Sequence, residues 1–173
     1  MSGRAKLIVV AGLPGTGKST LVDYLGSELS LPVVTKDEAE ALLKRSDAGP
    51  GLNSGWIAYD LLTLFAGEQL RRNVSVVIDS VAGSLSIRES WRRLADKYGA
   101  EFVVVECICS DVALHKQRLS VRKRNIEGWP EITWEHVLEV QSGYKEWNEE
   151  RLVLDSADNL QDNADKLRDY LRK

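Results

Sequence analysis

The stretch IVVAGLPGTGKSTLVDYL, residues 8–25, decides the fold of this chain. It begins in a run of apolar, β-branched residues that predicts a buried strand over residues 7–11. It ends in a segment with apolar residues along one helical stripe, which predicts a helix over residues 18–29. Three glycines lie between the two segments. A strand that passes through a glycine-rich turn into a helix is typical of an α/β fold.

The turn matches the pattern G-x-x-x-x-G-K-[ST] at every fixed position, from Gly12 to Ser19. In this pattern, the P-loop, glycines let backbone N–H groups point inward at phosphate oxygens, and the positive end of the next helix adds attraction. Lys18 is expected to reach the β- and γ-phosphates, and the Ser19 hydroxyl to coordinate Mg²⁺. The sequence thus predicts binding of ATP or GTP with Mg²⁺. The predicted binding residues are Gly12, Leu13, Pro14, Gly15, Thr16, Gly17, Lys18, Ser19 and Thr20.

Length and composition favour one globular domain over residues 1–173. The 23 basic and 26 acidic residues give a net charge of −3, which disfavours nucleic acid as a partner. No apolar run approaches the about 20 residues that cross a membrane, so we expect no membrane contact. Cys107 and Cys109 have neither redox nor zinc spacing, and we expect two buried free thiols on one face of a strand. Such thiols fit a cytoplasmic location.

Short β-branched runs alternate with helical patterns along the chain. This alternation predicts right-handed βαβ crossovers and a three-layer α/β sandwich with a parallel sheet. The expected strands cover residues 7–11, 32–35, 74–79, 102–108 and 152–155, and the expected helices cover residues 18–29, 55–71, 86–98, 111–124, 133–147 and 159–171.

Accessory motifs separate the functions that a P-loop can serve. The N-K-x-D and D-x-x-G motifs of a GTPase switch do not occur in the sequence. A motor ATPase places a glutamate after the acidic end of its second phosphate-sensing strand to polarise a water molecule. Here the segment VVID is followed by Ser80 instead. The sequence therefore favours phosphoryl transfer over hydrolysis.

Two carboxylates follow predicted strands, at the edge where open α/β sheets bind ligands. Asp37 follows the run PVVT and begins a helix, and Asp79 ends the run VSVVID. In a phosphotransferase one such carboxylate accepts the proton of the attacking hydroxyl. The alternatives are a helix N-cap for Asp37 and a structural carboxylate that binds loop N–H groups for Asp79.

The basic segment HKQRLSVRKRN, residues 115–125, is the third feature that favours a kinase. Arg118 and Arg122 are four residues apart and share one helix face. We interpret the region around residues 115–130 as a small helical lid that excludes water and neutralises charge on the transferring phosphoryl group. The alternative is a solvated helical face.

These residues together resemble the small P-loop kinases, a group that includes the zeta-toxin sugar-nucleotide kinases, phage-type polynucleotide kinase and chloramphenicol phosphotransferase. The similarity is carried by VVAGLPGTGKST, TKDEAEALL, VSVVIDS, RESWRRLADKYGAEFVVVECICSD, HKQRLSVRKRN, SGYKEWNEE and LVLDS. The resemblance implies the sheet order 2-3-1-4-5 and Asp37 as general base. It also implies Asp79 near the acceptor or the metal, and Arg118 and Arg122 on the ATP phosphates.

One position departs from these kinases. Relatives often have an arginine where this chain has Glu40, and Arg45, Arg88 and Arg92 are candidates to replace it. An acidic residue at this position argues against a polyanionic acceptor. Opposite Asp37, Trp56 and Tyr59 share a helix face and are candidates for an aromatic wall around the acceptor, or else for ordinary helix packing.

Other aromatic and polar residues have more ordinary interpretations. His115 and His136 are expected to be exposed, and Trp129, Trp134 and Trp147 to be packing residues. The nucleotide base is expected near Asp155–Ser156 and the base of the lid.

Three functions remain open. The favoured one is an ATP- and Mg²⁺-dependent kinase for a hydroxyl of a sugar, nucleoside or antibiotic, with a nucleotide and a small molecule as partners. The others are a polynucleotide 5′-hydroxyl kinase, which the acidic balance disfavours, and an NTP-binding regulatory or toxin-like module.

Overall fold

The computed structural model describes residues 3–46, 53–122, 126 and 131–172. Over these residues the chain forms five strands and seven helices. The strands are β1 (Lys6–Ala11), β2 (Val33–Thr35), β3 (Val76–Asp79), β4 (Glu101–Ile108) and β5 (Leu152–Asp155). The helices are α1 (Lys18–Ser27), α2 (Lys36–Arg45), α3 (Ser54–Arg71), α4 (Leu85–Lys97), α5 (Val112–Val121), α6 (Trp134–Gly143) and α7 (Leu160–Arg172).

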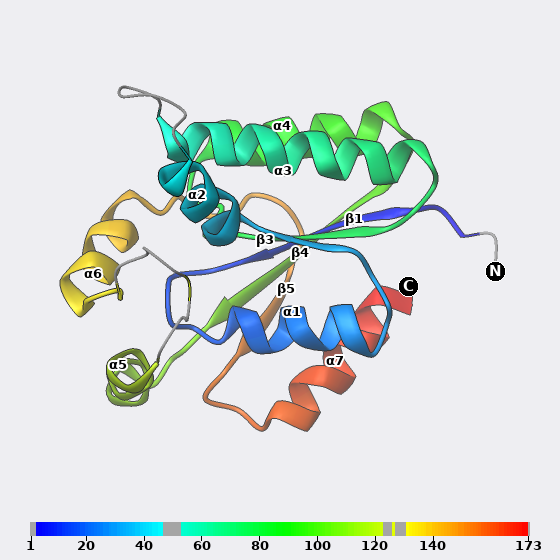
Figure 1. Ribbon diagram of the computed structural model, residues 1–173. Coiled ribbons are helices and arrows are strands. Elements are labelled where there is room, and N and C mark those ends of the chain that lie inside the picture. The colour runs from blue at the N-terminus through cyan, green and yellow to red at the C-terminus, as the bar shows by residue number, and fades with distance from the viewer. Residues whose placement is uncertain (1–2, 47–52, 123–125, 127–130, 173) are drawn as a thin grey trace.

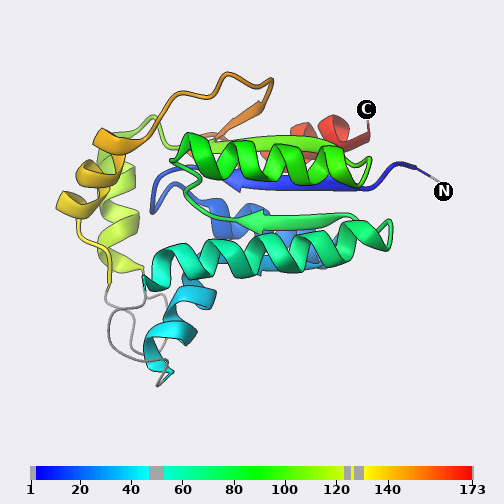
Figure 2. The same cartoon turned by 90° about the horizontal axis from the view of Figure 1, so that it is seen from above.

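The strands form one parallel sheet in the order β2-β3-β1-β4-β5, which confirms the predicted α/β class and strand order. Central β1 pairs with β3 on one side and with β4 on the other. In Figures 1 and 2, α3 and α4 cover one face of the sheet, and α1 and α7 cover the other. The three-layer sandwich is therefore confirmed.

The buried strands show why the sequence folds in this way. Successive residues of a strand point to opposite faces, and both faces of β1 are covered by helices. Leu7 and Val9 pack in the cluster that contains Trp91 of α4, whereas Ile8 and Val10 pack in the cluster that contains Leu25 of α1. All four β1 residues are buried, as the continuous apolar run requires.

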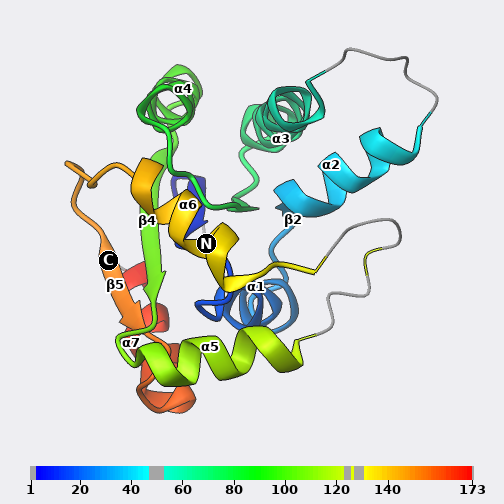
Figure 3. The same ribbon diagram turned by 90° about the vertical axis from the view of Figure 1, so that its left-hand side faces the viewer.

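The remaining helices α2, α5 and α6 gather at the end of the sheet where β1 runs into the P-loop, which Figure 3 shows face-on. The helix expected over residues 133–147 ends earlier, at Gly143, and α5 ends at Val121. Residues 123–125 and 127–130 of the predicted lid, with Trp129, lie outside the described residues. Among the helices that the structure describes, none is both long and apolar enough to cross a membrane.

Candidate active site

The backbone of residues 12–17, here called the phosphate cradle, connects β1 to α1 at the carboxyl end of the sheet. Gly12 has a φ of 138°, and a Cβ added there would lie 2.2 Å from the carbonyl oxygen of Cys107. This close approach of two backbones excludes any side chain at Gly12. Gly15 and Gly17 also have positive φ angles, of 82° and 93°. The glycines therefore permit the backbone conformation that the sequence predicted for this loop.

Lys18 lies at the start of α1, close to both predicted carboxylates. Its ammonium donates hydrogen bonds to the carbonyl oxygens of Gly12 and Leu13, both at 2.9 Å. Burial lowers the pKa of Lys18, and the nearby charges of Asp79 and Asp37 oppose that shift. The carboxylates thus help to keep a buried cation charged beside the cradle.

A cleft of about 560 Å³ opens beside the cradle and brings most of the predicted site together. Its lining includes Lys18, Ser19, Asp37, Asp79 and Arg122. Asp37 comes from the first turn of α2, and Asp79 is the last residue of β3. Because Thr35 of β2 pairs with Asp79 in the sheet, the start of α2 lies next to the end of β3. Strand pairing therefore places the two carboxylates in one cleft.

The two arginines predicted to belong to a lid contact different residues and line different cavities. Arg122 donates a hydrogen bond to the Ser19 hydroxyl at 2.8 Å, and it lines the cleft with Asp37. Arg118 donates to the hydroxyl and the carbonyl oxygen of Ser156, at 2.8 and 3.0 Å. Arg118 and Ser156 line a separate cavity of about 380 Å³, together with Gly17.

Asn163, which lines this second cavity, carries a buried polar atom without a partner in the described part of the chain. Asn163 of α7 is 3% exposed, and its amide nitrogen donates to the Asp155 carbonyl oxygen at 2.7 Å. Its Oδ1 has no hydrogen-bond partner among the residues that the structure describes. Buried polar atoms are nearly always paired, so this oxygen fits a ligand that donates a hydrogen bond.

The groups around Ser19 have the chemistry that Mg²⁺ prefers. A pocket of about 220 Å³ has the side-chain oxygens of Ser19, Thr35, Asp37 and Asp79 in its lining, together with Asp23, Glu38 and the guanidinium of Arg122. Within the described part of the chain, no group of three or more His, Cys, Asp or Glu residues could hold a metal ion. Mg²⁺ usually takes only one or two protein carboxylates and completes its shell with water and substrate phosphates. The Ser19 hydroxyl with one of these carboxylates therefore fits Mg²⁺ held jointly with a nucleotide.

Side chains of α2 and α3 form what we call the acceptor end of the cleft, with Lys36, Glu40, Lys44 and Tyr59 on its wall. Glu40 is buried, forms an ion pair with Lys36, and lies 3.2 Å from the Lys44 ammonium. Burial alone would raise the pKa of Glu40, but the two lysines hold it below its usual value. Two cations thus offset the single acidic charge, so the argument from Glu40 against an anionic acceptor does not hold.

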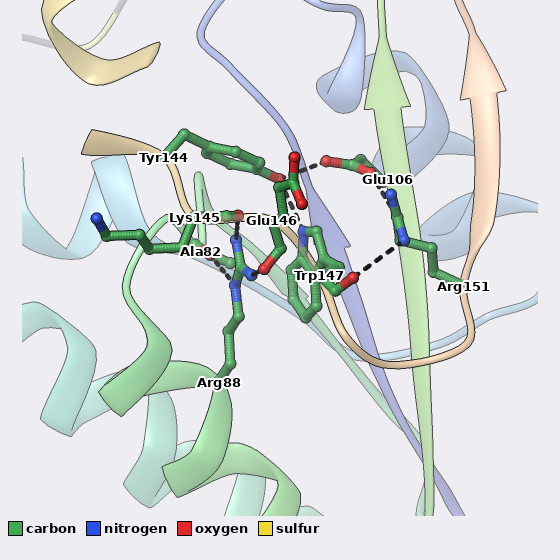
Figure 4. Close-up of polar contacts among 8 residues, drawn as sticks. All are labelled: Ala82, Arg88, Glu106, Tyr144, Lys145, Glu146, Trp147 and Arg151. Atoms are coloured by element: carbon green, nitrogen blue, oxygen red, sulfur yellow. Dashed lines mark hydrogen bonds and ion pairs between the residues drawn. The ribbon is translucent and has the colours of Figure 1, made fainter. Parts of the chain in front are cut away.

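The expectation that Arg88 contacts the acceptor is wrong. Arg88 is 1% exposed, and its guanidinium donates three hydrogen bonds of 2.6–2.7 Å to the carbonyl oxygens of Ala82, Lys145 and Glu146. It also stacks over the ring of Trp147, 3.7 Å from the ring centroid, as Figure 4 shows. These hydrogen bonds engage the guanidinium of Arg88 with backbone carbonyl oxygens instead of an acceptor. Arg88 therefore anchors the segment after α6 to the turn after β3.

The other two arginine candidates also lie away from the acceptor end. Arg92 pairs with Glu89 and Asp96 on its own helix, at 2.9 and 3.4 Å. Arg45 is exposed at the last residue of α2. The cations that line the acceptor end are instead Lys36 and Lys44. The candidates from the sequence were all arginines, and these two lysines were not among them.

The predicted aromatic wall is reduced to one residue. Trp56 and Tyr59 are neighbours, with ring centroids 6.1 Å apart, but only Tyr59 lines the cleft. Trp56 is 51% exposed. Tyr59 also packs on Trp91 at 5.9 Å, and burial raises the pKa of its phenol. Tyr59 therefore presents a protonated hydroxyl at neutral pH.

His115 is a buried residue that the sequence interpretation placed at the surface. It is 4% exposed, its Nε2 lies 2.8 Å from the carbonyl oxygen of Pro14, and its ring meets Trp134 edge-on. The sequence feature that could have indicated its position is spacing. His115, Arg118 and Arg122 are three and four residues apart and so share one helix face. His136 is exposed as expected, and it lines the cleft.

The cysteines agree with the prediction in part. Cys107 is buried on β4, and its thiol lies 2.7 Å from the Thr16 carbonyl oxygen. Cys109 follows the end of β4 and is only partly buried. Both are free cysteines.

A parallel sheet in this order, with the phosphate cradle between β1 and α1, defines the P-loop NTPase class of fold. The chain belongs to the AAA domain family, which it matches over residues 7–146. No curated protein matches its sequence.

Solved structures of several P-loop proteins are similar in fold. A sugar kinase from Janibacter sp. superposes with a TM-score of 0.72 at 16% identity, over 97% of this chain and 95% of its own. A gluconokinase from Sinorhizobium meliloti gives 0.68 at 21% identity, over 96% and 91%. An APS kinase from Mycobacterium tuberculosis, solved with AMPPNP and APS, gives 0.68 at 20% identity, over 98% and 99%. At these identities the likeness shows a shared fold.

Proposed function

We propose that the protein is an ATP- and Mg²⁺-dependent kinase that transfers the γ-phosphoryl group to a hydroxyl of a small molecule. One observation carries this proposal: a single cleft collects Lys18 and Ser19 at the start of α1, the carboxylate of Asp37 and the guanidinium of Arg122. A carboxylate can activate either a water or an acceptor hydroxyl, but a cleft that continues from Asp37 to a separate acceptor end has room for a second substrate and suits transfer. The solved structures of similar fold that are named as kinases support the same class.

The nucleotide would lie along the cradle with its base in the cavity of about 380 Å³. The amino group of adenine is a hydrogen-bond donor, which suits the unpaired Oδ1 of Asn163. Mg²⁺, held by Ser19 and Asp79, would neutralise phosphate charge. Arg122 donates to the Ser19 hydroxyl, so its guanidinium lies close to the proposed phosphate site. Nucleotide binding would draw this guanidinium onto the phosphates.

Asp37 would serve as the general base. The acceptor oxygen bonds to the γ-phosphorus, the bond from that phosphorus to the β–γ bridging oxygen breaks, and ADP leaves with its electron pair. The hydroxyl proton passes to the Asp37 carboxylate. Lys18 and Arg122 would stabilise charge on the transferring group.

The acceptor end favours a compact polyol such as a sugar. Hydroxyl groups of Thr35, Tyr59, Ser80, Ser84 and Thr133 line the cleft and can donate to or accept from a polyhydroxylated ligand. The same cleft must also receive the γ-phosphate, so within about 560 Å³ the acceptor is small.

The test is ADP formation with MgATP against sugars, sugar acids, nucleosides, antibiotics and 5′-hydroxyl oligonucleotides. At least one small acceptor should raise turnover well above the rate without acceptor, and Asp37→Asn should lower kcat about 10²- to 10⁴-fold. Asp60→Asn, an exposed carboxylate of α3 outside the cleft, is the matched control. A flat panel despite tight ATP binding would contradict the kinase and favour a regulatory nucleotide-binding module.

A further inference from the structure

Two carbonyl groups of the phosphate cradle are held by side chains from outside the P-loop pattern. The carbonyl oxygen of Pro14 lies 2.8 Å from Nε2 of His115, which belongs to α5. The carbonyl oxygen of Thr16 accepts a hydrogen bond of 2.7 Å from the thiol of Cys107, which belongs to β4. The mechanism proposed above uses neither side chain.

The planarity of the peptide bond gives these contacts a consequence. In a trans peptide, the carbonyl group of one residue and the N–H group of the next point in opposite directions. A donor that holds the Pro14 carbonyl on one side therefore aims the N–H of Gly15 to the other side. The Thr16 carbonyl and the N–H of Gly17 are related in the same way.

The two donors lie behind the cradle, away from the acceptor cleft. That cleft is lined by Pro14 and Lys18 but by neither His115 nor Cys107. Both donors instead line a cavity of about 470 Å³, together with Gly12 and Thr16 of the cradle. The carbonyls that they hold thus point away from the side on which Lys18 lines the cleft. Cys107 also lines the cavity of about 380 Å³ proposed for the base, so the comparison of Cys107→Ala with Cys107→Ser, which differ in the donor, carries the test at this residue.

We infer that His115 and Cys107 are positioning residues, which turn the N–H groups of Gly15 and Gly17 toward the phosphates by holding the carbonyls of Pro14 and Thr16 behind the cradle. This inference rests on the proposed function, because the phosphates are those of the proposed nucleotide. The sequence pattern specifies a backbone that can form the cradle, and these two side chains select its orientation.

Packing and chemistry keep both donors in place. The ring of His115 is fixed edge-on against Trp134, with centroids 5.1 Å apart, and a Cβ added at Gly15 would lie 3.0 Å from its Nε2. A carbonyl oxygen only accepts hydrogen bonds, so Nε2 must carry the proton. Burial raises the pKa of the Cys107 thiol to about 11, so this side chain also remains a donor at neutral pH.

Two matched pairs of variants separate positioning from packing. His115→Phe keeps an aromatic ring against Trp134 but loses the donor, whereas His115→Gln places an amide N–H near the position of Nε2. Cys107→Ala loses the donor, and Cys107→Ser keeps one. Cys109→Ala is the control for removal of a thiol, because Cys109 contacts Asp111 rather than the cradle.

The measurement is the Kd for MgATP by calorimetry, with the thermal midpoint of the nucleotide-free protein recorded in parallel. His115→Phe and Cys107→Ala should each raise the Kd about 3- to 10-fold, as expected for the loss of one hydrogen bond. His115→Gln, Cys107→Ser and Cys109→Ala should bind within about 2-fold of the wild type.

Two results would overturn the inference. If all five variants bind MgATP like the wild type, or if Kd follows the thermal midpoint without rescue by Gln and Ser, the side chains only pack, and the proposed function stands. If the wild type itself fails to bind MgATP, the proposed function fails and the inference fails with it.

Discussion

The phosphate cradle and the acceptor end share one cleft but are built from different parts of the chain. The cradle is backbone from residues 12–17, and its carbonyls are held by Lys18, His115 and Cys107. The acceptor end is made of side chains from α2 and α3, whose charges pair with one another at Glu40. A backbone cradle can be specified by a short sequence pattern, whereas the chemistry of the acceptor end depends on how separate helices pack.

The largest effect is expected from a substitution beside the cradle. Lys18→Gln removes the cation that faces the transferring phosphoryl group in the proposed mechanism, and it should lower kcat about 10²- to 10³-fold with every acceptor. Lys97→Gln, at an exposed position of α4, is the matched control and should leave kcat unchanged. Steady-state kinetics with two different acceptors checks this, and a loss confined to one acceptor would contradict it.

The next effect concerns Arg88, which anchors the segment after α6 to the turn after β3 and belongs to neither region. Arg88→Met leaves three carbonyl oxygens without their donor, and it should lower the free energy of unfolding by about 3 kcal/mol. Arg92→Met, on the same helix, removes only ion pairs at a partly exposed site and should change it by less than about 0.5 kcal/mol. Urea denaturation of both variants provides the measurement. Equal effects would show that Arg88 is not an anchor.

These arginines also show how far the sequence could predict the site. The motif predicted the backbone path of residues 12–17 correctly, since its glycines adopt positive φ angles. Arg88 was misassigned because its partners, the carbonyls of Lys145 and Glu146, lie 57 and 58 residues away in the chain. The same contacts occur just after Gly143, where the helix expected to reach residue 147 ends. Long-range contacts decided both the role of Arg88 and the end of α6, and helical periodicity in the sequence does not indicate such contacts.

His115 illustrates the same limit on a smaller scale. Its charged neighbours indicated a solvated helix, but the face that it shares with Arg118 and Arg122 packs on the cradle, on Ser19 of α1 and on Ser156. The fold was predictable because alternating apolar runs report burial directly. The partner of a buried polar group is not encoded locally.

A pair of sugars that differ in charge tests the role of the two lysines at the acceptor end. With two lysines around Glu40, a sugar acid should be phosphorylated at least as well as the neutral sugar of the same carbon skeleton. Lys44→Gln should lower kcat/KM for the acid about 3- to 10-fold and leave that for the neutral sugar nearly unchanged. Kinetics on the matched pair checks this, and an equal change for both sugars would contradict it.

The smallest effect is a pH dependence of stability. The pKa of Glu40 in the folded protein lies below its ordinary value of 4.5, so its stabilising contribution is complete above that pH and is lost as the pH falls through the folded value. Glu40→Gln should lower the free energy of unfolding by about 1 kcal/mol at neutral pH. The difference from wild type should shrink below pH 4.5. A difference that stays constant from pH 7 to pH 3 would contradict this.

The most direct test of the central claim is to follow the fate of the γ-phosphate by ³¹P NMR in one reaction with MgATP and the best acceptor of the panel. The account predicts a new phosphomonoester signal that grows in step with ADP, little inorganic phosphate, and loss of that signal in Asp37→Asn. Inorganic phosphate as the main product, unchanged by the acceptor, would show a hydrolase and contradict the account.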